Sequence, residues 1–378
     1  MESNKKPSLE LIQAAPKVLL HEHLDGGLRP QTVLDLAKDC GYEGLSETEP
    51  RALAEAFFAG ADKGSLPEYL QGFGHTIAVM QTAEALERVA YEFVEDMKAD
   101  NVVYAEVRFA PHFHTQEELG LDGVMTAVLK GLRRGHNDFG VRCNLIVCAM
   151  RNQGADLSLR LAELALSYRN HGCVGFDLAG EEAGHPANHH LEAFQFIKRS
   201  NFNITIHAGE SFGPESIWQA VQYCGAHRIG HGVRLVEDIV IYDHKVIRVG
   251  NLAQYILDHR VPLEVCLSSN VHTGAAPSLK EHPFPYFWSE GYRVTLSTDN
   301  RLMSHTTMTE EYAIAVNQFG LSFDDLEKLT LNAMKSAFAP YAERVETIYR
   351  LIKPGYRALR TANQMPEPED PYGSEEGS

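Results

Sequence analysis

The stretch KVLLHEHLDGG, residues 17–27, places two histidines at the end of a short apolar run and then stops at a pair of glycines. The apolar residues 18–20 are typical of a buried strand, and the glycines allow the chain to turn sharply afterwards. Side chains at positions i and i+2 of a strand point to the same side. His21 and His23 can therefore face one point, while Glu22 faces away from it.

Seven further runs of β-prone residues follow this first one, and longer segments with helical spacing separate them. Strands that alternate with helices form βαβ units, and a series of such units forms a parallel sheet. Eight units predict an α/β protein with a closed (β/α)8 TIM barrel, and an open, doubly wound sheet is the alternative. The eight predicted strands are Val18–His21, Val102–Phe109, Arg142–Cys148, Val174–Leu178, Asn203–His207, Arg228–Gly230, Pro262–Cys266 and Arg293–Ser297.

The rest of the chain fits one domain with a short tail. A helical insertion of about residues 45–98 separates the first two predicted strands, and Ser322 with Asp325 resembles a capping box at the start of a later helix. We expect residues 1–360 to form a single barrel domain. Residues 361–378 are rich in Pro, Glu, Gly and Ser, a composition that predicts a disordered acidic tail.

The composition disfavours several classes of partner. The chain has 34 Lys and Arg against 51 Asp and Glu, a net charge of −17, and both nucleic acid and anionic membranes attract basic proteins instead. The 6 cysteines include no CxxC pair, which indicates a reducing compartment without disulfides. The N-terminus lacks the apolar core of a signal peptide, and no apolar run approaches the roughly 20 residues that span a bilayer. We therefore expect a cytoplasmic protein, and the sequence leaves its oligomeric state open.

Histidines and carboxylates recur at the ends of the predicted strands. His207 and Glu210 follow the fifth strand in HAGE, His231 follows the sixth in RIGHG, and Asp299 with Asn300 follows the eighth in STDN. In a TIM barrel the carboxyl ends of the strands surround the active site. One such motif alone more often has a structural role, as a helix N-terminus or an Asx turn. The prediction of an active site depends on their joint occurrence in one βα array.

Neutral imidazoles and one carboxylate suit Zn²⁺, and such a ligand set leaves a position open for water. We predict that His21, His23, His207 and Asp299 bind one Zn²⁺ per subunit. The ion would lower the pKa of its bound water towards about 7. Binuclear amidohydrolase barrels commonly carry a carboxylated lysine at the end of the fourth strand, but this strand reads VGFDLAGEE, so a single ion is favoured.

Two further side chains have the right positions for proton transfer. Glu210 lies three residues after His207, where burial would raise its pKa and make it a proton donor. His231 can orient the hydroxide or take its proton. A second His-x-His pair, His112 and His114, lies beyond a proline that ends the second strand, and we exclude it from the metal site.

At these residues the sequence closely resembles the adenosine deaminase family. The similarity extends from about Lys17 to Phe338 and includes, in the family's order, LLHEHLDGGLRP, SLPEYLQGF, VVYAEVRFAPH, DLAGEE, HAGE, RIGHG, EVCLSSN and STDN. The form STDNRLMS is similar to that of the bacterial branch. The resemblance implies a mononuclear zinc enzyme that hydrolyses the 6-amino group of adenosine or 2′-deoxyadenosine and gives inosine and ammonia.

The resemblance also implies a role for each matching residue. The four predicted ligands match the family's zinc ligands, and Glu210 matches the residue that protonates purine N1 while zinc-bound hydroxide attacks C6. His231 matches the residue that orients this hydroxide. Gly180 matches the glycine whose N–H meets purine N3, and Asp25 matches the acid near the ribose 5′-hydroxyl. The predicted catalytic residues are thus Glu210, His231 and Asp299, and the predicted substrate-binding residues are His23, Asp25, Gly180, Asn300, Leu66, Tyr69, Leu70 and Phe73.

Two of these predictions depart from a simple family match. Leu66, Tyr69, Leu70 and Phe73 have helical spacing, so they could pack on the barrel, but the resemblance favours a lid that excludes water from the ribose side. Asn300 stands where many family members have a second acid. An amide can donate a hydrogen bond to purine N7 without a proton of its own, so this substitution is compatible with purine recognition.

Other functions are alternatives to the deamination of adenosine. A deaminase of adenine, aminodeoxyfutalosine or a 5′-modified adenosine would use the same ring chemistry. AMP is disfavoured, because the chain has no Gly-rich phosphate loop and no basic cluster near the predicted site. A metal-dependent hydrolase of another bond and a non-catalytic binding protein would not need Glu210. The HxE and PCxxC signature of the zinc deaminases that edit nucleic acids is absent.

Overall fold

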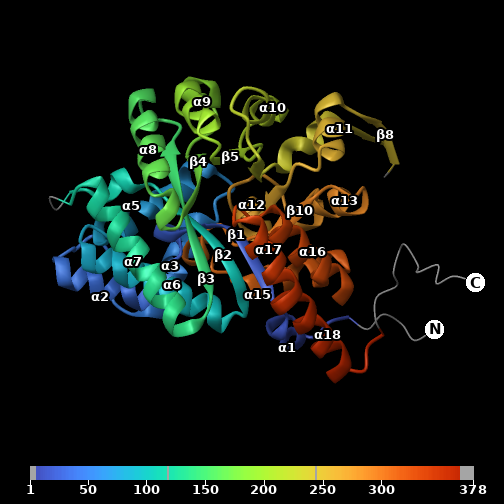
Figure 1. The fold of residues 1–378 in the computed structure, drawn as a ribbon, viewed down its shortest axis with the longest axis horizontal. Coiled ribbons are helices and arrows are strands. Elements are labelled where there is room, and N and C mark those ends of the chain that lie inside the picture. Colours follow the sequence, from blue (N-terminus) through green and yellow to red (C-terminus); the bar gives the residue numbers. More distant parts are fainter. Residues whose placement is uncertain (1–5, 117–118, 243–244, 367–378) are drawn as a thin grey trace, which may run out of the picture.

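Eight parallel strands form one sheet in the order β1-β2-β3-β4-β5-β6-β9-β10 (Figure 1). The computed structural model describes residues 6–116, 119–242 and 245–366. The sheet closes after β10, since the N–H of His23 donates to the Asp299 carbonyl (2.7 Å) and the N–H of Asp299 donates to the His21 carbonyl (2.9 Å). The predicted (β/α)8 barrel is confirmed. Its strands are β1 (Lys17–His23), β2 (Val102–Phe109), β3 (Arg142–Met150), β4 (Cys173–Ala179), β5 (Asn203–Ala208), β6 (Arg228–His231), β9 (Leu263–Val265) and β10 (Val294–Leu296).

Helices connect the strands around the outside of the barrel (Figure 1). They are amphipathic, with apolar side chains buried towards the sheet and polar ones exposed. The helices are α6 (Ala83–Ala99), α7 (Leu121–Phe139), α8 (Ala155–Ser167), α9 (Leu191–Arg199), α10 (Pro214–Gln222), α11 (Asn251–Asp258), α12 (Leu267–His272), α13 (Phe284–Ser289), α14 (Arg301–Ser304), α15 (Met308–Phe319) and α16 (Phe323–Ser336).

Helices α6 and α7 pack closely because α7 has glycine at two positions of the face that meets α6. A Cβ atom on Gly131 would lie 2.3 Å from the carbonyl oxygen of Glu87, and one on Gly135 would lie 2.5 Å from the side chain of Val94. Interiors pack at crystal-like density, so a larger residue at either position would force the two helices apart.

The helical insertion after the first strand is confirmed, although its start differs from the prediction. It begins at α2 (Pro30–Cys40) and continues through α3 (Pro50–Ala61), α4 (Leu66–Tyr69) and α5 (Phe73–Val79). The last part of the predicted range, α6, is instead the helix that returns the chain to β2. Helical spacing continues through all five helices, so the pattern alone does not show which of them packs on the sheet.

An antiparallel hairpin of β7 (Ile239–Tyr242) and β8 (Lys245–Val249) is an addition to the predicted strands. The apolar run of β7 has the same local pattern as a barrel strand. It stays outside the barrel because β6 pairs directly with β9, with Ile229 opposite Leu263, and leaves no place in the sheet between them.

The C-terminal helices pack back onto α16. After α17 (Tyr341–Thr347), helix α18 (Lys353–Ala362) buries Arg360, whose guanidinium lies 2.6 Å from both Asp324 and Glu327. Helix α18 continues to Ala362, just past the predicted start of the acidic tail, and the part of that tail from 367 to 378 lies outside the described residues. Within the described ranges, no helix combines the length and the apolar character needed to cross a membrane.

The capping box predicted at Ser322 is present at the start of α16. The Ser322 hydroxyl accepts from the Asp325 N–H (3.2 Å), and the Asp325 carboxylate accepts from the Ser322 N–H (2.9 Å). We expect Ser322→Ala to destabilise the fold by about 1 kcal/mol, because one buried helix terminus loses its cap. Urea denaturation would measure this, with exposed Ser46→Ala as the control. Equal midpoints for the two variants would contradict a stabilising role for the cap.

Candidate active site

A cavity of about 240 Å³ opens at the carboxyl ends of the barrel strands. All predicted site residues except His21 line it, and His21 is fully buried beside them. The lining residues are His23, Asp25, Leu66, Tyr69, Leu70, Phe73, Gly74, Ile77, Ala110, Phe113, Cys148, Met150, Asn152, Ala179, Gly180, His207, Glu210, His231, Asp299 and Asn300.

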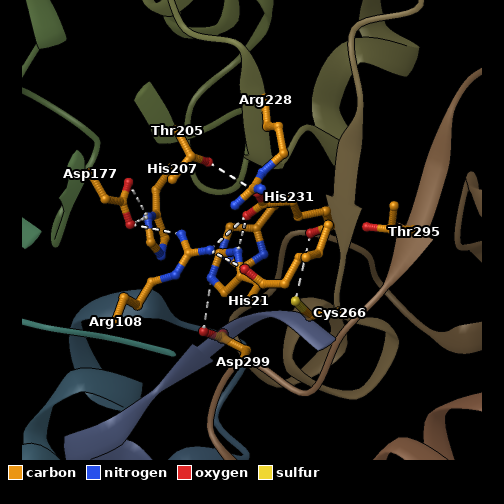
Figure 2. A network of polar contacts seen from close by, with 12 residues as sticks. His21, Arg108, Asp177, Thr205, His207, Arg228, His231, Cys266, Thr295 and Asp299 are labelled. Atoms are coloured by element: carbon orange, nitrogen blue, oxygen red, sulfur yellow. Dashed lines mark hydrogen bonds and ion pairs between the residues drawn. The ribbon is translucent and has the colours of Figure 1, made fainter. Parts of the chain in front are cut away.

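Side chains that can bind a metal meet at the base of this cavity. One donor atom from each of His21, His207, His231 and Asp299 lies within 4.8 Å of the others. Figure 2 shows the three imidazoles close together beside Asp299. His23 reaches the same group, since its Nε2 lies 3.0 Å from Nε2 of His207 and 3.6 Å from Oδ1 of Asp299. The structure thus brings the four predicted ligands together and adds His231 to them.

Hydrogen bonds fix which ring nitrogens of His21 and His207 carry hydrogen. Nδ1 of His21 lies 2.8 Å from the Glu264 carboxylate, and Nδ1 of His207 lies 3.1 Å from the Asp177 carboxylate. A carboxylate only accepts, so both Nδ1 atoms donate and both Nε2 atoms keep a free lone pair. Nε2 of His21 is buried and has no hydrogen-bond partner within the described chain.

His231 has the opposite arrangement. The Asn270 amide oxygen accepts from the Cys266 N–H (3.2 Å), so the amide nitrogen faces Nδ1 of His231 at 3.0 Å and donates to it. The hydrogen of neutral His231 must then lie on Nε2, which is 3.7 Å from Oε2 of Glu210. Burial, with the nearby His21, lowers the pKa of His231 well below its usual range and keeps the ring neutral. His231 therefore presents a donor to the cavity, where His21 and His207 present lone pairs.

The donor set fits a metal cation. Nε2 of His207 keeps its lone pair and faces Nε2 of His23 at 3.0 Å, so either a hydrogen on Nε2 of His23 or a positive charge near both atoms must join them. Burial, with the neighbouring His207, lowers the pKa of His23 to about 3, so a proton is a poor candidate for that charge. Burial and Arg108 act to lower the pKa of His21, but the carboxylates of Asp299 and Glu264 outweigh them and raise it. The cluster therefore attracts positive charge, and imidazole with carboxylate is a donor set that zinc prefers.

Glu210 lies on the turn between β5 and α10 and points into the cavity. It is buried, and burial, with the charges of Asp299 and Glu182 nearby, raises its pKa well above its usual range. A raised pKa favours the protonated form of its carboxyl group, which can act as an acid.

Two residues of the site have backbone conformations that favour glycine. His231, the last residue of β6, has a φ of +62°, and Asp299, three residues after β10, has a φ of +63°. Non-glycine residues rarely adopt this region, and such strain often occurs at functional sites. The turns aim both side chains at the cluster, and Asp299 is held further by a hydrogen bond of 2.5 Å from the Ser269 hydroxyl.

Comparison with known proteins agrees with this geometry. The chain matches the family model described as adenosine deaminase over residues 16–354. It is 50% identical over 363 residues to adenosine deaminase 1 of Streptomyces coelicolor, and the match covers 95% of this chain and 91% of that protein. It is 51% identical over 358 residues to the adenosine deaminase of Mycobacterium leprae, with 93% and 98% covered. The chain belongs to the adenosine deaminase family.

Solved structures show the same fold. An N6-methyl-AMP deaminase of Arabidopsis has a TM-score of 0.77 and 30% sequence identity, with 90% of this chain and 98% of that chain covered. The adenine deaminase of Arthrobacter aurescens has a TM-score of 0.81 at 24% identity, with 92% and 99% covered, and shares the fold. The chain is thus an enzyme of the adenosine deaminase family, and proteins with different named activities have this barrel.

The segment predicted as a lid forms one wall of the cavity. Leu66, Tyr69, Leu70 and Phe73 all line it from α4, α5 and the turn between them. Tyr69 also packs in the core, and its hydroxyl lies 2.8 Å from that of Ser304. Tyr69 therefore both lines the cavity and packs in the core, and the role of the segment as a lid stays a prediction.

His114 is a cavity neighbour that the sequence prediction assigned to a loop. It is buried, its Nδ1 donates to the Met80 carbonyl (3.0 Å), and its Nε2 lies 3.5 Å from Oδ2 of Asp25. Oδ1 of Asp25 is buried without a partner among the described residues. His114 is not among the residues whose donor atoms meet at the base of the cavity, and it contacts the cavity-lining Asp25 instead.

An ion network beneath the cluster was also missed. Arg108 donates to Asp177 (2.7 Å) and Glu264 (2.9 Å), the two carboxylates that hold His207 and His21 (Figure 2). Burial raises the pKa of both carboxyls, but nearby positive groups outweigh this effect. His207 and Arg108 hold the pKa of Asp177 well below its usual range, and Arg108 and Arg228 do the same for Glu264. Charged residues in the middle of β-prone runs could have indicated this network, because a charged side chain buried in a strand needs a partner of opposite charge.

Arg108→Met leaves Asp177 and Glu264 buried without their shared cation. We expect the free energy of unfolding to fall by about 3–5 kcal/mol, the usual cost of removing one partner from a buried ion pair. Arg51→Met is the control, because its pair with Glu55 is exposed and should contribute little. Urea denaturation of both variants measures the difference, and similar midpoints would contradict the network's role.

Proposed function

We propose that this protein is a zinc-dependent hydrolase that deaminates adenosine and 2′-deoxyadenosine to inosine and ammonia. The main support is the buried Glu210, whose pKa burial raises, beside a cavity-lining cluster of histidines and an aspartate. The adenosine deaminases that are about half identical over most of the chain support the choice of substrate. Zinc would be held by His21, His23, His207 and Asp299.

The metal is assigned to these four side chains because their donor atoms are free. Nε2 of His21 and of His207 keep lone pairs, whereas Nε2 of His231 carries a hydrogen. When bound, zinc supplies the Lewis acidity that makes water a nucleophile at neutral pH. His231 stays outside the ligand set and donates from Nε2 to the attacking oxygen, which it orients towards the purine.

Glu210 supplies the proton that the reaction needs at the ring. Its raised pKa favours the protonated carboxyl group, and donation to purine N1 makes C6 more electrophilic. The N1 proton stays on the product, the proton of the hydroxyl added at C6 passes to the leaving amine, and the proton released by the attacking water restores the Glu210 carboxyl group. Around this centre we assign the Gly180 N–H to purine N3 and the Asn300 amide to N7. Both residues line the cavity, and the +92° φ of Gly180 turns its backbone there.

The charge of the cavity favours a nucleoside over a nucleotide. Its described lining contains Asp25, Glu210 and Asp299 but neither lysine nor arginine. The free Oδ1 of Asp25 can accept a hydrogen bond from a ribose 5′-hydroxyl, whereas a 5′-phosphate would face a carboxylate. This distinguishes the proposal from the activity named for the N6-methyl-AMP deaminase that shares the fold.

Other 6-aminopurines are the second candidate substrates. The adenine deaminase with the same fold shows that a free base can be a substrate on this scaffold. Adenine has no ribose, so it would leave the Asp25 carboxylate, which His114 contacts, without a hydrogen-bond partner. This buried polar pair therefore favours a substrate with a sugar.

Glu210→Gln tests the proton donor. We expect turnover of adenosine to fall at least about 100-fold, because an amide of the same shape cannot protonate N1. Zinc content should stay at the wild-type value, since Glu210 is outside the ligand set. Chelation should abolish wild-type turnover, and added zinc should restore it. The loss of the 265 nm adenosine absorbance would report the rate, and near-normal turnover by the variant would refute the assigned role.

Adenosine and AMP can be compared directly on the wild-type enzyme. We expect kcat/KM for AMP to be lower by more than about 100-fold, because juxtaposed like charges cost several kcal/mol. Asp25→Asn should narrow the gap, since it removes the facing negative charge. An enzyme that prefers AMP would disprove the nucleoside assignment.

A further inference from the structure

Glu182 lies in the loop after β4 and binds the turn that carries Glu210. Its Oε1 accepts from the N–H of Gly209 (2.6 Å), and its Oε2 accepts from the N–H groups of Glu210 (3.0 Å), Ser211 (2.8 Å) and Phe212 (3.0 Å). Four consecutive backbone donors thus converge on one carboxylate. Glu182 is 4% exposed, so water does not replace these bonds easily.

The turn needs these bonds because it belongs to no helix or strand. It occupies residues 209–213, between the end of β5 and the start of α10, so its N–H groups have no regular partners. Gly209 has a φ of +72°, and a Cβ there would lie 2.5 Å from the Ile217 side chain, so the turn is also sterically confined.

Arg234 holds the opposite side of the same turn. Its backbone N–H donates to the Gly209 carbonyl (2.9 Å), and its Nε donates to the Glu210 carbonyl (3.0 Å). The peptide groups on both sides of the Glu210 Cα are therefore fixed, the N–H groups by a carboxylate and the carbonyls by an arginine. The only freedom left to Glu210 is the rotation of its own side chain.

We propose that Glu182 is a positioning residue that fixes the Glu210 carboxyl group for proton transfer by binding the four N–H groups of its turn. The inference rests on the proposed role of Glu210. Glu182 lies two residues after Gly180, whose N–H we assign to purine N3. One loop would therefore position both the purine and the Glu210 carboxyl group. A carboxylate is needed, because a glutamine side chain offers one acceptor oxygen and a donor in place of the other.

Glu181 provides a matched control. It is the adjacent residue of the same type, it is only half-buried, and neither the hydrogen bonds nor the ion pairs of the described residues include its side chain. Glu182→Gln and Glu181→Gln therefore make the same chemical change in one loop, and only the first removes contacts to the turn.

We expect Glu182→Gln to lower kcat for adenosine 10- to 100-fold, since a misplacement of about 1 Å can have an effect of this size. KM should change less than threefold and zinc content should not change, because neither substrate nor metal touches Glu182. Glu181→Gln should match the wild type. Glu182→Asp, which keeps both oxygens, should recover part of the rate. A Glu182→Gln variant within twofold of the wild type, or one whose loss lies in zinc content, would overturn the proposal.

A double variant separates this proposal from a general loss of structure. If Glu182 acts through Glu210, adding Glu182→Gln to Glu210→Gln should cause no further fall in kcat, whereas independent effects would multiply. Hydrogen exchange should also accelerate at the amides of residues 209–212 in Glu182→Gln and not in Glu181→Gln. Multiplying effects or unchanged exchange would overturn the proposal. If Glu182→Gln does not fold, Glu182→Asp takes its place in both measurements under the same criteria.

The proposed function has separate tests, so the two can fail independently. A wild-type enzyme that leaves adenosine unchanged, or a Glu210→Gln variant with normal turnover, would refute the proposed function. The amide exchange of the turn would still decide whether Glu182 holds it. Normal activity of Glu182→Gln beside an inactive Glu210→Gln would refute the positioning role alone.

Discussion

The contact between Arg108 and the carboxylates of Asp177 and Glu264 is the interaction on which the site depends. It keeps both carboxylates ionised inside the barrel, and each one accepts the Nδ1 hydrogen of a histidine. The lone pairs of His21 and His207 consequently face the cavity. A buried carboxylate without a cation would be protonated or would destabilise the fold. The orientation of the imidazoles therefore depends on the buried charges.

Buried carboxylates position the groups of the site in two places. Below the cluster, carboxylates bound by arginine orient imidazole side chains, and beside it the carboxylate of Glu182 orients the backbone that carries Glu210. In both cases a side-chain carboxyl group in the interior has its hydrogen-bond partners within the protein. The chemical groups that meet the substrate are thus held by neighbours that do not meet it.

Local sequence patterns predict much of this molecule. All eight barrel strands and the capping box at Ser322 follow from them, and the residues at the strand ends do converge on one cavity. The patterns do not distinguish β7 from a barrel strand, because only the pairing of β6 with β9 excludes it. Asp177, Glu264 and Glu182 are missed since their partners are distant in sequence or are backbone groups. His114 is missed because its role appears only next to Asp25.

The barrel closes through hydrogen bonds between Asp299 and the end of β1. The proposed ligands His21, His23 and Asp299 therefore lie where the first strand meets the last. A ribosome must complete nearly 300 residues before these two strands can meet. Contacts between such distant residues form late in folding, because closing a long loop has a high entropic cost. The proposed metal site therefore cannot assemble before Asp299 has been made, and we expect a newly made molecule to be inactive until the whole sheet has closed.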